Sequence, residues 1–197
     1  MSKADRNGPG TTGRILDVAE RMLQVRGYNG FSYGDVAAEL DITRAALHYH
    51  FKGKAELGQA LIERYAARFA DALAHLDATA PDAAAKLRGY AELYSDVLSA
   101  DRMCLCGMLA AEHRTLPDPL QQAVCAFFAS NTAWLRRVLE EGCTDGSLRC
   151  PGTSMDTASM VLGALEGAML ITRLDGDVAR FTATADQLLS GFSPARA

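Results

Sequence analysis

The stretch from Ser32 to Lys54, SYGDVAAELDITRAALHYHFKGK, restricts the possible folds of this chain more than any other. Ser32 and Asp35 match the helix-start signature in which a hydroxyl and an acid three residues later satisfy free backbone amides. Thr43 is a natural N-cap for a second short helix over residues 44–49. Apolar residues at helical spacing turn one face of the first helix inward: Val36, Ala37 and Leu40. The pattern predicts a helix-turn-helix over about residues 32–51.

The second predicted helix has only three anchoring residues, Ala46, Leu47 and Phe51, and its other side chains face outward. A helix of this length fits the major groove of DNA, with its first residues at base edges and its flank along phosphates. Arg44 can pair with a guanine edge, and Tyr49, His50 and Lys54 suit phosphate oxygens. The residues assigned to DNA binding are Ser32, Tyr33, Thr43, Arg44, Ala45, His48, Tyr49, His50, Lys52 and Lys54. Spacing alone leaves an ordinary helical hairpin with a polar solvent face as the alternative.

The residues themselves favour DNA binding. The run LHYHFKGK follows DITRAA and is preceded by a helix that ends in RGYNGFS, and this arrangement resembles the TetR family of bacterial repressors over residues 9–69. The usual tyrosine after the recognition-helix leucine is His48 here, and Tyr49 beside it can substitute. The resemblance implies double-stranded operator DNA as partner, a homodimer, nine helices, and a small effector held by the C-terminal domain.

Length and composition fit that arrangement. Residues 1–10 are polar and are expected to form a flexible N-terminal arm, residues 9–69 a three-helix DNA-binding domain, and residues 70–197 a larger helical domain for effector binding and dimerisation. The net charge of −4 argues against a nucleic-acid binder, but the charge is uneven. Residues 1–60 hold eight Lys and Arg against seven Asp and Glu, so the acidic excess lies in the remainder.

The chain carries five cysteines and no signal peptide, so a cytoplasmic protein with reduced thiols is expected. The longest apolar stretch, residues 160–171, is short and contains Glu166, so no membrane association is expected.

Helical periodicity and turn residues predict the remaining helices. Thr11 or Thr12 is expected to cap the first helix, which Gly27 ends, and a long helix beginning at Gly53 or Lys54 is the expected lever between the two domains. The later helices are predicted over residues 54–76, 82–100, 102–114 and 118–143. Two more follow: one that is capped by Thr153 or Ser154 and ends at residue 174, and a last one that ends near Ser190.

The eighth predicted helix carries small residues at the spacing that allows close helix packing: Gly163, Ala164, Gly167 and Ala168. They are assigned to a dimer interface, as the resemblance also implies for the last two helices. Close packing within one chain is the alternative.

A pocket for a small apolar or aromatic effector is expected among aromatic, methionine and polar residues of the C-terminal helices. The candidates are Tyr90, Tyr94, Met103, Cys104, Met108, Phe128, Asn131, Trp134, Glu166 and Met169. Asn131 and Glu166 are the strongest, because polar groups in apolar stretches need partners. The alternative is that these residues are simply core.

Cys104 and Cys106 lie at the start of the sixth predicted helix, where a helix N-terminus can lower the pKa of a thiol. The segment is similar to that of a TetR subfamily that senses electrophiles through a cysteine, which makes Cys104 a candidate sensor. The alternative is a small buried residue at a tight helix entrance.

Catalytic and metal-binding patterns are not found in the sequence. His113 and the two cysteines have no recognised ligand spacing, and no cofactor is expected. The motifs GxSxG and HExxH and a glycine-rich phosphate loop are missing, so an enzyme or carrier built on a helical bundle is the weaker reading.

Overall fold

The computed structural model describes residues 10–149 and 152–193, which form nine α-helices and one short 3₁₀ helix and contain no strand. The predicted all-α fold class is confirmed. The helices are α1 (Thr11–Arg26), α2 (Tyr33–Glu39), α3 (Arg44–His50), α4 (Lys54–Thr79), α5 (Ala83–Ser99), α6 (Leu105–Ala111), the 3₁₀ helix η1 (His113–Thr115), α7 (Asp118–Asp145), α8 (Ser154–Asp175) and α9 (Val178–Ser190).

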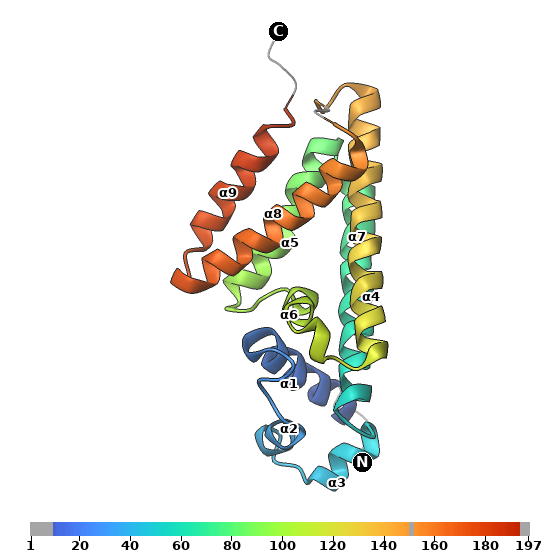
Figure 1. The fold of residues 1–197 in the computed structure, drawn as a ribbon, viewed down its shortest axis with the longest axis vertical. Coiled ribbons are helices and arrows are strands. Elements are labelled where there is room, and N and C mark those ends of the chain that lie inside the picture. The colour runs from blue at the N-terminus through green and yellow to red at the C-terminus, as the bar shows by residue number, and fades with distance from the viewer. Residues whose placement is uncertain (1–9, 150–151, 194–197) are drawn as a thin grey trace, which may run out of the picture.

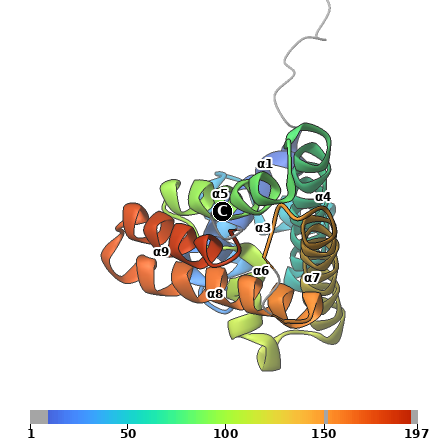
Figure 2. The same ribbon diagram turned by 90° about the horizontal axis from the view of Figure 1, so that it is seen from above.

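The molecule is elongated, with α1, α2 and α3 at one end and the other helices stacked beyond them (Figure 1). The long helices α4 and α7 lie side by side along one edge, and α8 and α9 pair on the opposite side (Figure 2). Helix α4 starts beside α3 and runs without a break past residues 69 and 70, where the sequence divides the two predicted domains.

Side-chain capping groups explain most helix starts. Ser32 and Asp35 form the predicted capping box, and Thr43 and Thr153 accept amide hydrogen bonds as predicted. The caps predicted at Thr11 or Thr12 are wrong, because α1 begins after Gly10 and both threonines lie inside the helix.

The sixth predicted helix, over 102–114, is also wrong in its bounds. The sulfur of Cys104 accepts the amide of Gly107 at 3.3 Å and starts α6 only at Leu105, and the chain then tightens into η1 after Glu112. A cysteine is an uncommon N-cap, which is why the ordinary start signals miss it.

The small core of the predicted DNA-binding domain joins all of its helices. Ile15 and Leu23 of α1, Val36 of α2 and Leu47 of α3 are fully buried, and Leu57 of α4 closes the cluster. Ala46, predicted as an anchor, is exposed, so the apolar anchors of α3 are Leu47 and Phe51.

Helix α8 is long and apolar enough to span a membrane by length and composition. It packs against α7 and α9, and its apolar outward side is described below.

The expectation of reduced thiols is wrong for Cys143, which is disulfide-bonded.

Candidate functional site

A capping box starts α2, and the hydroxyl of Tyr33 ties α2 to α3. The amide of Ser32 donates to the Asp35 carboxylate at 2.6 Å, and hydrogen bonds from Ser32 lower the pKa of that carboxyl. The hydroxyl of Tyr33 donates to the carbonyl of Leu47 at 3.1 Å and also to that of Phe51. Its ring lies 4.9 Å from that of His48. Ser32 and Tyr33 are both predicted DNA contacts. In this structure Ser32 also caps α2, and Tyr33 also holds α3 in place.

The outward face of α3 carries most of the residues predicted to contact DNA. The predicted contact residues Arg44, Ala45, His48 and Tyr49 are exposed, as are the N-cap Thr43 before them and Lys52 after them. Tyr49 is 88% exposed, so its ring and hydroxyl are free to contact a partner. His50 is half-buried, and its Nδ1 lies 2.9 Å from the hydroxyl of Thr12. That contact ties α3 to the start of α1.

Lys54 does not extend outward with the others. Its ammonium donates to the carbonyls of Tyr28 and Phe31 and lies 4.5 Å from the centre of each of their rings. Burial lowers the pKa of this lysine, and the nearby carboxylates of Glu112 and Asp35 oppose that shift. Lys54 therefore has a structural role, because it holds the loop between α1 and α2. This role competes with the predicted contact to a DNA phosphate.

The aromatic candidates of the effector pocket come together in the C-terminal core. The Tyr90 hydroxyl donates to Asn131 Oδ1 at 3.2 Å and lies 3.1 Å from the Tyr94 hydroxyl. The ring of Tyr90 stacks on Trp134 with centroids 5.6 Å apart. Tyr90 and Tyr94 are buried almost completely, and burial raises the pKa of both phenols. These side chains pack directly against one another and form one buried cluster.

Cys104 and Glu166 lie next to this cluster. Burial raises the pKa of the Glu166 carboxyl, while hydrogen bonds from Cys104 and Tyr94 oppose the shift. Burial raises the pKa of Cys104 well above the ordinary thiol value, and Glu166 adds to that effect. The prediction that a helix N-terminus makes this thiol acidic is therefore wrong. Buried Cys106 has a raised pKa for the same reason.

The other pocket candidates are divided between core and edge. Met103 and Met169 are buried, whereas Phe128 and Met108 are half-buried, and the Met108 sulfur contacts Arg173.

A groove of about 350 Å³ between α4 and α7 reaches the cluster from outside. Its walls are mostly apolar, with Phe69 and Phe127 among them, and the polar residues that line it are Glu63, Ser130 and Asn131. Asn131 thus connects the groove to the Tyr90 hydroxyl. Asn131 could be selected from the sequence, but the groove could not, because it depends on how two distant helices pack.

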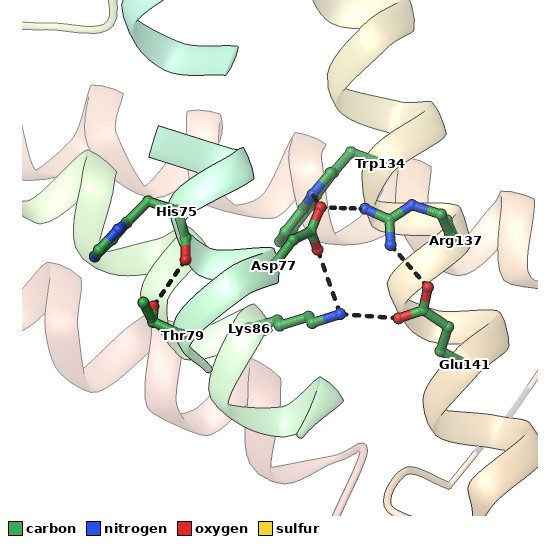
Figure 3. A network of polar contacts seen from close by, with 7 residues as sticks. All are labelled: His75, Asp77, Thr79, Lys86, Trp134, Arg137 and Glu141. Atoms are coloured by element: carbon green, nitrogen blue, oxygen red, sulfur yellow. Dashed lines mark hydrogen bonds and ion pairs between the residues drawn. The ribbon is translucent and has the colours of Figure 1, made fainter. Parts of the chain in front are cut away.

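Behind the cluster, an ion-pair network links three helices (Figure 3). Asp77 near the end of α4 accepts from Trp134 Nε1 at 3.0 Å and from Arg137 at 2.6 Å. Lys86 bridges Asp77 and Glu141 at 3.3 and 3.0 Å. Although partial burial raises the pKa of Asp77, these hydrogen bonds hold it below its ordinary value. The C-terminal end of α4 is thereby fixed to α5 and α7.

The carboxylate of Glu112 joins the segment after α6 to the loop after α1. Glu112, which follows α6, accepts the amides of Tyr28 and Asn29 at 2.6 and 3.2 Å. The Asn29 side chain also donates to Thr115 at 2.7 Å. Gly27 has φ +82°, and a Cβ there would lie 2.9 Å from the Glu112 carboxylate. The sequence carries no local signal for this contact, because its partners are more than 80 residues apart.

The outward side of α8 is apolar and lacks a partner within the described chain. Added Cβ atoms at Gly163 and Gly167 would meet nothing within 4 Å. The large exposed apolar residues of this helix are Met155, Met160, Leu170, Ile171 and Leu174. Of the four residues assigned to a dimer interface, the two glycines lie on this surface, Ala164 is half-buried, and Ala168 packs against the core of its own chain.

Metal binding has no support in the part of the chain that the structure describes, where no group of three His, Cys, Asp or Glu side chains is placed to hold an ion.

An exposed recognition helix on a small three-helix core, followed by a larger helical domain, defines a helix-turn-helix transcriptional regulator. Residues 15–61 match the family model "Bacterial regulatory proteins, tetR family", and residues 83–188 match "Tetracyclin repressor-like, C-terminal domain". The chain belongs to the TetR family of DNA-binding transcriptional regulators, which are not enzymes.

Individual relatives agree with this assignment. A TetR-family transcriptional regulator from Agrobacterium tumefaciens has 32% identity and a TM-score of 0.89, over 92% of this chain and 97% of that one. The transcriptional regulator AcuR of Cereibacter sphaeroides is 28% identical over 78% of this chain and 72% of its own length. The regulator TtgR of Pseudomonas putida is 40% identical, but the match spans 27% of this chain and 25% of TtgR.

Proposed function

We propose that this protein is a cytoplasmic, homodimeric repressor that holds a palindromic operator until a small effector binds its C-terminal domain. The observation that carries the proposal is the outward face of α3, on which Thr43, Arg44 and Tyr49 are exposed while Leu47 and Phe51 anchor the helix. A recognition helix with a fixed angle can present the same side chains to the groove without a large ordering cost.

Repression of this type requires two copies. Two recognition helices reach successive major grooves when they lie about 34 Å apart, or a multiple of that distance. The apolar outward side of α8 favours the pairing of two chains there, because monomers rarely expose such continuous apolar surface.

The effector is expected to be small and apolar or aromatic, and to enter through the groove between α4 and α7. Asn131 offers it a polar contact, and displacement of the Tyr90 ring would disturb the stack on Trp134. Because Trp134 donates to Asp77, that disturbance would reach the end of α4. Effector and operator then weaken each other's binding through a coupling free energy of about 1–3 kcal/mol.

The alternative is that covalent modification of Cys104 releases the protein from its operator. Burial and the raised pKa of the thiol argue against it, because the thiolate is the reactive form. A reversible effector is favoured. Treatment of the free protein with N-ethylmaleimide is expected to leave DNA affinity unchanged, in the wild type as in Cys104→Ser.

The operator experiment tests DNA recognition directly. Sites are selected from random duplexes with the wild-type protein, and affinities are then measured by fluorescence anisotropy for wild type and Arg44→Ala. Arg44→Ala is expected to lose about 1–3 kcal/mol of discrimination between the selected site and a mutated one. Lys52→Ala is the matched control, because loss of a phosphate contact weakens binding to all sequences alike. Unchanged discrimination in Arg44→Ala would remove base recognition from this residue.

The effector is sought by thermal stability of the purified protein against lipophilic cations, phenols and antibiotics. A ligand of the folded state at 100 times its dissociation constant adds about 2.7 kcal/mol to stability. A ligand that binds through the groove is expected to bind more weakly to Asn131→Leu. Equal binding to both proteins would place the effector elsewhere.

A further inference from the structure

The C-terminal end of α1 is completed by groups from the C-terminal domain. The last carbonyls of a helix have no partner within the helix and carry a partial negative charge. The amide of Met103, between α5 and α6, donates to the carbonyl of Gln24 at 3.3 Å. The guanidinium of Arg173, near the end of α8, donates to the next carbonyl, that of Val25. The buried side chain of Gln24 donates in return to the Met103 carbonyl at 3.0 Å.

The loop directly after α1 is held by the opposite charge. The carboxylate of Glu112 accepts the amides of Tyr28 and Asn29. A cation therefore meets the carbonyl end of α1, and an anion meets the free amides that follow it. Residues 24–29 are called the α1 joint below, because two separate elements of the C-terminal domain hold this short segment.

Arg173 is the residue that links the α1 joint to α8. A hollow of about 270 Å³ lies between the end of α1 and the turn from α8 to α9, and Arg173 lies in its wall. The guanidinium also donates to the Met108 sulfur of α6 at 3.0 Å. Within residues 10–149 and 152–193, no carboxylate forms an ion pair with Arg173. The carbonyl end of α1 is therefore the electrostatic partner of this arginine.

The place of Arg173 on α8 gives this contact its meaning. Leu170 and Leu174 lie in the same last turn of the helix and are 54% and 83% exposed. They belong to the apolar outward side that is proposed above to pair two chains. One turn of α8 thus carries both a part of that surface and the contact to the α1 joint.

We propose that Arg173 is a positioning residue for operator binding, which sets the orientation of the DNA-binding domain relative to α8. It acts through α1, whose Ile15 and Leu23 share one buried core with Leu47 of the recognition helix. A shift of the α1 joint therefore moves the recognition helix with it. In a dimer paired through α8, this orientation fixes the separation of the two recognition helices, so the proposal rests on the function proposed above.

Operator spacing tests the proposal with DNA. One base pair added to or removed from the centre of the selected operator changes the separation of the half-sites by about 3.4 Å and rotates one by about 34°. Affinities for the three spacings and for a single half-site are measured by fluorescence anisotropy. The wild type is expected to prefer the selected spacing, because its recognition helices are held at one separation. Loss of folded protein would lower all apparent affinities alike, so their ratio separates positioning from stability.

Variants at Arg173 assign the contact. Arg173→Met keeps the apolar stem and removes the donors, so it is expected to reduce the preference for the selected spacing at least about threefold and to leave half-site affinity unchanged. Arg173→Lys keeps a cation at the carbonyl end of α1 and is expected to retain most of the preference. Arg180→Met is the matched control, because Arg180 is an exposed arginine on α9 that pairs with Asp175, and it is expected to behave as wild type.

A distance measurement tests the same proposal without DNA. Spin labels are attached to Cys125, which is exposed on α7, and to Ala45→Cys, at an exposed position on α3. Cys104 and Cys106 are buried and are protected from the label. Labelled chains are mixed with an excess of unlabelled protein, and double electron–electron resonance then reports the distance within one chain.

Arg173→Met is expected to shift or broaden this distance distribution, whereas Arg173→Lys and Arg180→Met keep that of the wild type. The proposal is overturned if Arg173→Met has the wild-type distribution, or if it keeps the wild-type preference for one operator spacing. A wild type that is monomeric or binds no operator would overturn the proposed function instead. The distance measurement would still decide whether Arg173 positions the DNA-binding domain.

Discussion

At the scale of the residue, Lys52 and Lys54 have opposite surroundings. Lys52 is exposed, whereas the Lys54 ammonium is bound to two backbone carbonyls inside the DNA-binding end. Lys54→Met is expected to lower the free energy of unfolding by about 2 kcal/mol, because both carbonyls lose a charged donor. Urea unfolding measures this change.

Lys52→Met is the matched control for that prediction. It is expected to leave the unfolding free energy unchanged and to reduce the salt dependence of operator binding by about 0.9 in slope, the value for one phosphate contact. If Lys54→Met instead reduces the salt slope and keeps full stability, Lys54 contacts DNA and the clamp is not its main role.

Glu166 predicts a pH dependence of stability. Burial raises the pKa of its carboxyl above the ordinary value of 4.5, so in the window between the two values the folded protein holds a proton that the unfolded chain has released. The contribution of Glu166 to the stability of the folded protein is present below pH 4.5 and is lost as the pH rises through the pKa of Glu166 in the folded protein. Glu166→Gln cannot ionise, so its Tm is expected to rise by a few degrees relative to wild type as the pH increases from about 4 to 8.

The control for Glu166 is Glu92→Gln, at an exposed position on α5. Its Tm is expected to follow that of the wild type over the whole pH range. Parallel curves for Glu166→Gln and wild type would mean that this carboxylate is ionised in the folded protein without cost.

At the scale of the element, α6 and η1 connect the C-terminal domain to the loop after α1 through Glu112. Glu112→Gln keeps the size of the side chain and removes the charge that accepts the amides of Tyr28 and Asn29. It is expected to lower the unfolding free energy by about 1–2 kcal/mol and to speed hydrogen exchange at these two amides. Glu140→Gln removes an exposed ion pair on α7 and is expected to change stability by less than about 0.5 kcal/mol. Unchanged hydrogen exchange at both amides in Glu112→Gln would show that the Glu112 carboxylate does not hold the loop after α1.

Elements with local signals could be predicted from the sequence. Ser32, Thr43 and Thr153 cap helices from within the next turn, and the exposed side of α3 follows from its periodicity. The start of α6 could not be predicted, because it depends on the sulfur of Cys104. The inward turn of Lys54 depends on carbonyls more than 20 residues away.

The core candidates show the same limit. Composition selected Tyr90, Asn131 and Trp134 as pocket walls, and the structure brings all three together. It also stacks their rings, which no sequence pattern specifies, so the space available to a ligand lies at the edges of the cluster.

At the scale of the whole molecule, the outward side of α8 decides whether one chain or two form the functional unit. Leu174 is 83% exposed and Leu170 is 54% exposed, so a charged residue at either position costs an isolated chain little. In a dimer that buries this surface, each substitution places an unpaired charge in an apolar interface. The double variant Leu170→Glu, Leu174→Glu is therefore expected to shift the sedimentation coefficient from dimer to monomer while its helical content stays that of the wild type.

Operator affinity connects this assembly to DNA binding. A monomer contacts one half-site, so the double variant is expected to bind the full operator at least about 100-fold more weakly than the wild type. Ala74→Glu, at an exposed position on α4, adds a charge away from α8 and is expected to remain dimeric and to bind normally. A double variant that stays dimeric would assign the dimer interface to another surface. A monomer that keeps full operator affinity would instead separate DNA recognition from dimerisation.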